Sequence, residues 1–312
     1  MRPTHTIAAI AAGWIAAVAV VGILVRDARV EALQRARQSS ATLALVLEEH
    51  TARAFQAVSL TLDTVVDALQ RTPGVEGNDP AFQALLTKRL HDLPYARAIF
   101  VIGPDGYILH GTDDPLTPNV SLADRPYFEL HRDNPALDIS IAAPLLSRSG
   151  LGWFVAVSRP VGRGSVFEGI VVAAVQPAYF ETLFRRMALG AGDVMMLFNR
   201  DGVLVAQYPG GAESIGKPTA SLIFSEHLPR SPSGAYRTRP GIFSYERVVS
   251  YRSVEGVPLV VGLSVSTDAF LAQWRRSALG AAIAMAALTL LLAFLVIHLI
   301  HQKKLRDRAR ER

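Results

Sequence analysis

Two long apolar runs lie near the two ends of the chain. Every residue at positions 7–25 is apolar or glycine, and across positions 278–297 the sole polar residue is Thr289. Each run is close to the roughly 20 residues that a helix needs to cross a hydrocarbon core about 30 Å thick. The pattern therefore predicts one transmembrane helix over residues 7–25 and a second over residues 278–298.

Each apolar run also has an alternative interpretation. For the first it is a cleaved signal peptide, because Arg2 precedes the run and small residues lie near its end. An uncleaved anchor is favoured, because the run is longer than a usual signal-peptide core and continues into a helical pattern. For the second run the alternative is a buried core helix. That run is apolar on all faces and ends at a basic tail, which favours a membrane span.

The segment after the first run has the pattern of one long helix. Residues 27–72 contain no glycine and no proline, and apolar residues recur every three or four positions at 55, 58, 62, 65 and 69. This spacing predicts an amphipathic helix with a narrow apolar seam, which a stretch rich in glycine and asparagine at 73–80 ends. The seam is long enough to pack on its own domain and on a second subunit, so we expect a homodimer.

A strand pattern follows and occurs twice. Residues 98–110 and 194–206 each read as strand, Asp-Gly turn and strand. Residues 171–180 and 261–270 each read as a buried strand that runs into a helix. The two copies predict two α+β subdomains in series, a distal lobe over about 80–188 and a proximal lobe over about 190–265. Chance similarity of two hairpins is the alternative, because Asp-Gly turns are common.

The charge distribution orients the chain. The formal net charge is +5, and residues 302–312 carry six lysines or arginines against Asp307 and Glu311. Such a cluster is a juxtamembrane segment that contacts lipid rather than a nucleic-acid surface. The positive-inside rule places the basic tail 299–312 in the cytoplasm, and two crossings place residues 1–6 there too. We therefore expect a two-pass protein of the inner (plasma) membrane, with its central domain, residues 27–274, in the periplasm or outside the cell. The arginines at 26, 29, 275 and 276 flank the outer ends of the spans and argue mildly against this orientation.

Together these features resemble the double Cache family, the tandem PAS-like extracytoplasmic sensor domain of bacterial transmembrane receptors. The resemblance spans residues 27–274. Its most specific stretch is Asp-Arg-Pro-Tyr-Phe-Glu-Leu-His-Arg-Asp at 124–133, followed by 139–146, 153–160 and 169–179. It implies an α+β fold, with a long N-terminal helix and two PAS-like antiparallel-sheet lobes flanked by two transmembrane helices. It also implies a sensor of the histidine kinase, diguanylate cyclase or chemoreceptor type, which binds a small molecule in its distal lobe.

The same resemblance implies which residues bind the ligand. Arg125, Tyr127 and Phe128 match the family's Arg-x-aromatic-aromatic helix. A guanidinium offers planar donors to a carboxylate, and aromatic rings give rigid walls. The strands expected to face this helix add three further predicted ligand-binding residues: Ser140, Trp153 and Ser158. Two alternatives stay open, namely that Arg125 is a surface residue near Asp124 and that Trp153 is a core residue.

Two departures from the family pattern bear on the ligand. Members that bind amino acids carry an aspartate on the strand before the closing helix, and an upstream tyrosine. The corresponding positions here hold Ala174 and Val120. A small organic acid, or another anion, is therefore expected rather than a standard α-amino acid.

The composition offers no catalytic constellation. The chain has no cysteine, which excludes disulfides and thiolate metal sites. Its eight histidines are scattered; His298 and His301 are three positions apart and could ligate haem or a metal, but side chains at the bilayer edge are the preferred interpretation. Asp113-Asp114 lacks the spacing of a calcium loop. We expect no catalytic residue, no metal and no cofactor.

The leading hypothesis is a ligand-gated signal transducer that passes its signal through the second transmembrane helix. Residues 302–312 read like the start of a signalling helix, so the partner would be an output domain in cis or a separate protein. This chain is not expected to be an enzyme, and the question is open if a kinase or cyclase domain follows residue 312. The alternative is a membrane-anchored adhesion or scaffold module that binds protein and no small molecule; a tethered enzyme is the weakest reading.

Overall fold

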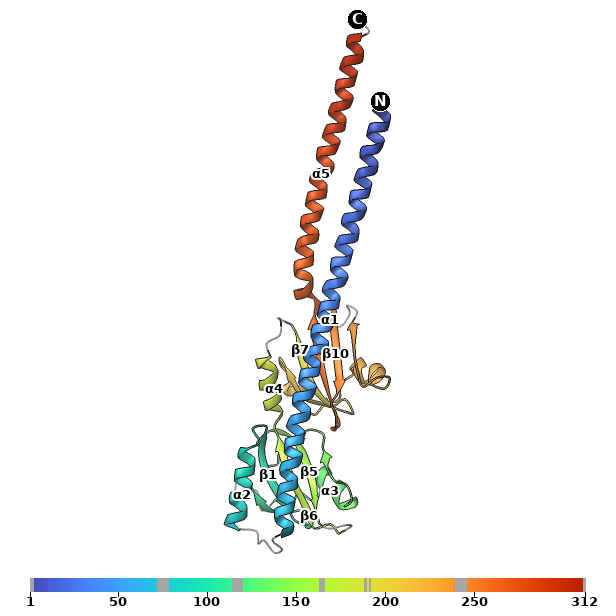
Figure 1. Ribbon diagram of the computed structural model, residues 1–312. Coiled ribbons are helices and arrows are strands. Elements are labelled where there is room, and N and C mark those ends of the chain that lie inside the picture. The colour runs from blue at the N-terminus through green and yellow to red at the C-terminus, as the bar shows by residue number, and fades with distance from the viewer. Residues whose placement is uncertain are drawn as a thin grey trace. The chain divides into compact units, whose positions relative to one another are not determined.

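A computed structural model describes residues 3–71, 79–113, 120–162, 166–187, 190, 192–238 and 246–310 (Figure 1). These residues form two compact units. The sheet unit comprises the described residues of 40–238 and 247–265, and the terminal unit those of 1–39, 239–246 and 266–312.

The predicted long helix is present as α1 (Pro3–Arg71). It includes the first apolar run as well as the amphipathic segment. Within the sheet unit the predicted seam is buried, with Phe55, Val58, Leu62 and Val65 at 2% exposure or less. Ion pairs between residues four apart, such as Arg53 with Glu49 at 3.4 Å, lie on the exposed side of the helix. The three- and four-residue spacing therefore identified the packed face correctly.

The distal lobe is built around an antiparallel sheet with strand order β2-β1-β6-β5-β3, to which β4 adds by pairing with β5. Two helices belong to this lobe, α2 (Pro80–His91) and α3 (Pro126–Asp133). The strands are β1 (Ala96–Ile102), β2 (Ile108–Gly111), β3 (Ser140–Ile141), β4 (Leu145–Leu146), β5 (Trp153–Val161) and β6 (Gly169–Val175).

The proximal lobe repeats this topology after helix α4 (Pro177–Arg186). Its sheet has the order β8-β7-β11-β10-β9, so in both lobes the last strand inserts beside the first. The two-copy prediction is thus confirmed at the level of strand order. The elements are β7 (Val194–Asn199), β8 (Leu204–Tyr208), the short helices η1 (Ala212–Ser214) and η2 (Ile223–His227), β9 (Ser233–Thr238), β10 (Arg247–Ser253) and β11 (Leu259–Ser266).

The two predicted hairpins have the same turn chemistry. Gly106 and Gly202 follow an aspartate in each turn and have φ values of 83° and 81°. A Cβ at Gly106 would lie 2.5 Å from the Cβ of Ala123, so glycine is required there for backbone and for space. The Asp-Gly dipeptides therefore mark the strand pairs β1–β2 and β7–β8 correctly.

Helix α1 runs past both sheets (Figure 1), and polar contacts fix it to each of them. In the distal lobe Arg159 of β5 pairs with Asp63 at 3.0 Å and donates to Ser59 Oγ at 3.1 Å. In the proximal lobe Ser40 Oγ donates to Ser250 Oγ of β10 at 2.7 Å, and Glu48 pairs with Arg252. One helix therefore serves both lobes.

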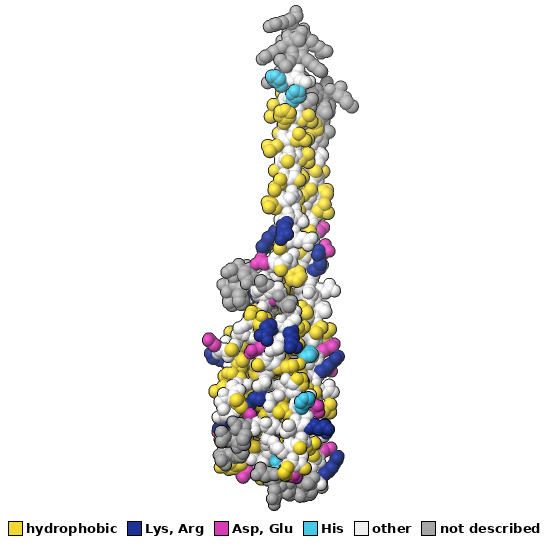
Figure 2. Space-filling model, turned by 90° about the vertical axis from the view of Figure 1, so that its left-hand side faces the viewer, with side chains coloured by type: hydrophobic (Ala, Val, Ile, Leu, Met, Phe, Trp, Pro, Cys, Tyr) yellow, Lys and Arg dark blue, Asp and Glu magenta, His cyan; other side chains and the backbone are white. Residues whose placement is uncertain are grey.

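The terminal unit joins the start of α1 to helix α5 (Thr267–Arg310). Trp274 Nε1 donates to the carbonyl oxygen of Val25 at 2.7 Å, and the Arg29 guanidinium lies 5.8 Å from the Trp274 ring. Both helices contain a segment long and apolar enough to cross a membrane, and neither apolar segment is buried by protein. Apolar side chains are spread along the visible face of this helical pair (Figure 2).

The seam on α1 gives a stability prediction. Leu62 is fully buried, whereas Leu60, half a turn away, is 59% exposed. Leu62→Ala should lower the free energy of unfolding by about 2–5 kcal/mol, because it removes buried methyl groups and leaves a cavity. The matched control Leu60→Ala should change it by less than about 0.5 kcal/mol. Pulse proteolysis of the full chain in detergent across a urea series measures both, and equal losses would contradict the assignment of the packed face.

Candidate ligand-binding site in the distal lobe

Helix α3 carries the predicted binding motif. Arg125 precedes it in extended conformation, and Pro126 occupies its first turn, where the missing N–H does no harm. Tyr127, Phe128 and His131 form its buried side. Burial raises the pKa of Tyr127 to about 12, so its phenol is neutral and can donate a hydrogen bond. The motif thus places an arginine at the helix start and two rings beneath it.

The sheet face under α3 carries small side chains at its centre. Ala98, Ala174 and Ala156 lie opposite one another across β1, β6 and β5, and all three are buried. Helix α3 contacts β5 and β6. This alanine row belongs to the distal core together with Phe100, Ile102, Ile108, Leu122, Tyr127, Phe128, Phe154, Ile170 and Val172. The face of the sheet toward α3 therefore has alanines at its centre and aromatic rings around them.

Arg125 reaches the β4–β5 hairpin. Its Nη2 donates to the carbonyl oxygen of Leu146 at 2.8 Å, whereas its Nε is buried and has no acceptor among the described residues. A buried N–H without an acceptor destabilises a protein by about 1–3 kcal/mol. Arg125 therefore retains a donor that an incoming oxygen would satisfy.

A second arginine holds the residues just before α3. Arg148 donates to the Ser121 carbonyl oxygen and pairs with Asp124 at 2.5 Å. The hydrogen bond from Arg148 holds the pKa of Asp124 below its usual value. The Asp124 carboxylate is therefore ionised and already has a cationic partner.

A third arginine was missed by sequence reasoning. Arg97 of β1 pairs with Asp113 at 2.8 Å, and the two side chains are 13% and 12% exposed. The register of β1 against β6 shifts between Ala96 and Ala98, which makes Arg97 the bulged residue. Its guanidinium lies 5.9 Å from the Phe154 ring, on the side of the alanine row. The one available signal was that Arg97 interrupts an otherwise apolar strand.

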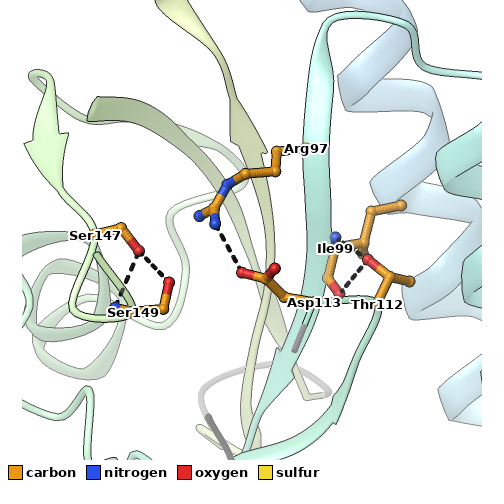
Figure 3. A network of polar contacts seen from close by, with 6 residues as sticks. All are labelled: Arg97, Ile99, Thr112, Asp113, Ser147 and Ser149. Atoms are coloured by element: carbon orange, nitrogen blue, oxygen red, sulfur yellow. Dashed lines mark hydrogen bonds and ion pairs between the residues drawn. The ribbon is translucent and has the colours of Figure 1, made fainter. Parts of the chain in front are cut away.

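Figure 3 shows how this pair lies. Arg97 and Asp113 point away from the helices behind the sheet and toward the hairpin that carries Ser147 and Ser149. Beside them Thr112 Oγ1 accepts from Ile99 N at 2.9 Å, which fixes the end of the β2 segment. The Arg97–Asp113 pair therefore borders the candidate site.

The structure brings Arg125, Tyr127 and Phe128 together at α3. Of the three predicted strand residues, Ser158 and Ser140 lie near this helix and Trp153 does not. Ser158 faces α3 and is fully buried, and Ser140 lies opposite it in register, half-buried on β3. Trp153 comes next to Phe154 on β5 and so points to the other face of the sheet. Its ring lies against the proximal lobe, where a Cβ at Gly216 would come within 2.6 Å of the ring. The predicted role of Trp153 as a wall of the distal pocket therefore does not match its position.

Sequence reasoning also missed His131, which is the hydrogen-bond partner of Ser158. Its Nε2 lies 3.0 Å from Ser158 Oγ and 3.2 Å from the Ser158 carbonyl oxygen. Burial lowers the pKa of His131, against hydrogen bonds to the backbone of Ser158 and Leu137 that raise it. The imidazole is therefore neutral near pH 7 and fastens α3 to β5.

Comparison with known families identifies the domain. The Cache domain model in its dCache_1 form matches residues 26–274. The extracellular domain of rpHK1S-Z16, described as a histidine kinase, is 30% identical with a TM-score of 0.69, and the match covers 77% of this chain and 98% of that one. No curated protein matches the chain.

Two chemoreceptor domains share the fold at lower identity. The ligand-binding domain of PctB from Pseudomonas aeruginosa PAO1, solved with L-Gln, is 17% identical with a TM-score of 0.57, covering 75% of this chain and 93% of that one. The domain of CtaA from Pseudomonas fluorescens, solved with L-isoleucine, is 15% identical with a TM-score of 0.58, covering 78% and 98%.

A long helix shared by two sheets of equal topology, with an arginine-aromatic helix over the first, defines the class as an extracytoplasmic ligand-binding sensor domain of membrane receptors. The chain belongs to the Cache domain family. Two apolar helices flank its sensor domain, which is not a catalytic domain.

The buried His131 gives a pH prediction. Above the ordinary histidine pKa of 6.5 the folded and unfolded chains are both neutral at this side chain. As the pH falls below 6.5, the unfolded chain takes up a proton that the folded chain refuses, so stability decreases. His131→Gln should therefore lose less melting temperature than the parent between about pH 7 and pH 5.5.

The control for this prediction is His91→Gln, at an exposed histidine that ends α2. It should keep the pH dependence of the parent. Differential scanning fluorimetry of the three proteins across the pH series measures the slopes. An unchanged slope in His131→Gln would show that His131 is not the titrating group.

Proposed function

We propose that this chain is the sensing part of a two-pass receptor in the inner, or plasma, membrane, and that its distal lobe binds a small organic acid. Family membership supports the sensor role. One observation carries the choice of ligand: the buried Nε–H of Arg125 has no acceptor among the described residues. A carboxylate beside Arg125 would accept this hydrogen bond, and charge-assisted bonds of this kind are the strong ones.

The surrounding charges favour an acid over an amino acid. Ala174 lies in the buried alanine row, where amino-acid-binding members of the family carry an aspartate. The two carboxylates that border the site, Asp113 and Asp124, are each paired with an arginine. A ligand ammonium group would therefore compete with a guanidinium for either carboxylate.

A chain of contacts links the ligand helix to α1. His131 of α3 bonds to Ser158, and the next residue along β5, Arg159, bonds to Ser59 and Asp63 of α1. A ligand that binds one arrangement of α3 more tightly than another shifts the population of this network by that difference in affinity. We propose that α1 and α5 pass the shift through the membrane to an output domain or partner protein, across a homodimer.

The Arg125 assignment has a direct test. Arg125→Gln should weaken binding of a small carboxylate at least about tenfold, because a charged donor is replaced by a neutral one. Arg132→Gln is the matched control, since Arg132 is an exposed arginine on the same helix that pairs with Asp133. Isothermal titration of the full chain in nanodiscs with acetate, propionate and pentanoate measures both.

Two results would contradict the proposal. Retained affinity in Arg125→Gln would remove Arg125 from the site. If the parent protein binds none of the acids and instead retains a protein partner through the same domain, the small-acid proposal is wrong.

The topology is testable because the chain has no cysteine. Ser225→Cys lies at an exposed position of the sensor domain, and Gln302→Cys lies at an exposed position beyond the second apolar segment. A membrane-impermeant maleimide added to intact spheroplasts should label Ser225→Cys at once and Gln302→Cys only after lysis. The reverse order of labelling would refute the proposed orientation.

A further inference from the structure

The Arg97–Asp113 pair is a nearly buried ion pair in the distal lobe. A nearly buried ion pair contributes little to stability compared with apolar residues of similar size, since desolvation offsets the attraction. Yet the strand departs from regular pairing at this point, and the bulge turns Arg97 toward the alanine row instead of toward α1. The arrangement places a guanidinium beside Phe154, at the border of the candidate site.

Arg97 and Arg125 approach the same short piece of the sheet. Arg125 donates to the Leu146 carbonyl oxygen, and Arg97 lies over the ring of Phe154. Leu146 pairs with Trp153, and Leu145 pairs with Phe154, so these contact points are neighbours on the β4–β5 hairpin. Both guanidinium groups therefore lie at the β4–β5 hairpin.

The two arginines differ in their charge balance. Arg97 is compensated by Asp113 at 2.8 Å, as Arg148 is by Asp124 at 2.5 Å. Arg125 donates to the Leu146 carbonyl oxygen and forms no ion pair within 4.0 Å among the described residues, although the Asp124 carboxylate, which is paired with Arg148, also acts on it electrostatically. The five residues thus carry one uncompensated positive charge, which matches one carboxylate on the ligand.

Arg97 still has donors to offer. A guanidinium carries five N–H groups. Within the described part of the chain its single hydrogen-bond partner is Asp113, which uses Nη1. The remaining N–H groups suit an oxygen that accepts a hydrogen bond without bringing a second negative charge next to Asp113.

From this charge count we propose that Arg97 is a second ligand-contacting residue, and that the ligand is an oxo or hydroxy acid with one carboxylate and one neutral oxygen acceptor. The inference rests on the proposed function and narrows its ligand class. The carboxylate binds Arg125, and the carbonyl or hydroxyl oxygen accepts from Arg97. Asp113 keeps Arg97 in place and disfavours a second carboxylate.

The first test uses the unmodified full chain in nanodiscs and pairs of acids that differ by one oxo group. Pyruvate is compared with propionate, and 4-oxopentanoate with pentanoate, by isothermal titration. At least one oxo acid should bind about tenfold more tightly than its parent acid, the effect of one added hydrogen bond to a charged donor. If the plain acids bind equally well, the inference fails and the proposed function stands; if no acid binds, both fail.

The second test assigns the effect to the pair. Arg97→Met should abolish the preference for the oxo acid over the plain acid of the same length, whereas Arg132→Met should keep this preference. Asp113→Asn leaves the Arg97 charge uncompensated, so succinate should bind at least about tenfold more tightly than it does to the parent protein. A preserved oxo preference in Arg97→Met, or unchanged succinate affinity in Asp113→Asn, would overturn the inference.

Discussion

The burial of a single seam on α1 is the constraint on which the rest of the structure depends. The central strands β6 and β11 are buried at every position, so both faces of each sheet are apolar and both must be covered. Each lobe covers one face from within, with α3 in the distal lobe and Ile223 of η2 in the proximal lobe. The helix α1 then serves both lobes through Ser40, Glu48, Ser59 and Asp63. A shift of either sheet against this helix must therefore change polar contacts as well as apolar packing.

Much of this architecture is encoded locally and was predictable. The seam of α1 follows from the spacing of Val58, Leu62 and Val65, and the two sheets follow from Asp-Gly turns, because both signals act over a few residues. The face on which Arg97 lies was not predictable: strict alternation puts it on the same face as Ile99, and a register shift against β6 turns it over. His131 was missed for a related reason, since its bond to Ser158 depends on where α3 docks on β5.

The candidate site shows how charge pairing sets specificity. Three arginines and two aspartates border the alanine row, and two of the arginines are already compensated. Arg125 was found through its helix motif, whereas the partners that compensate Arg97 and Arg148 come from segments distant in sequence. A motif alone therefore identifies one cation of the site, and the selectivity arises from pairs that only the folded chain assembles.

The contact between Trp153 and Gly216 has a consequence for how the two lobes act on each other. Gly216 has a φ of 78° and no room for a Cβ beside the indole ring, so backbone conformation and space both exclude larger residues. The ring sits at the start of β5, the strand that also carries Ser158 and Arg159. A displacement of β5 along its own axis would therefore be transmitted to the sheet of the proximal lobe by direct steric contact with the indole ring.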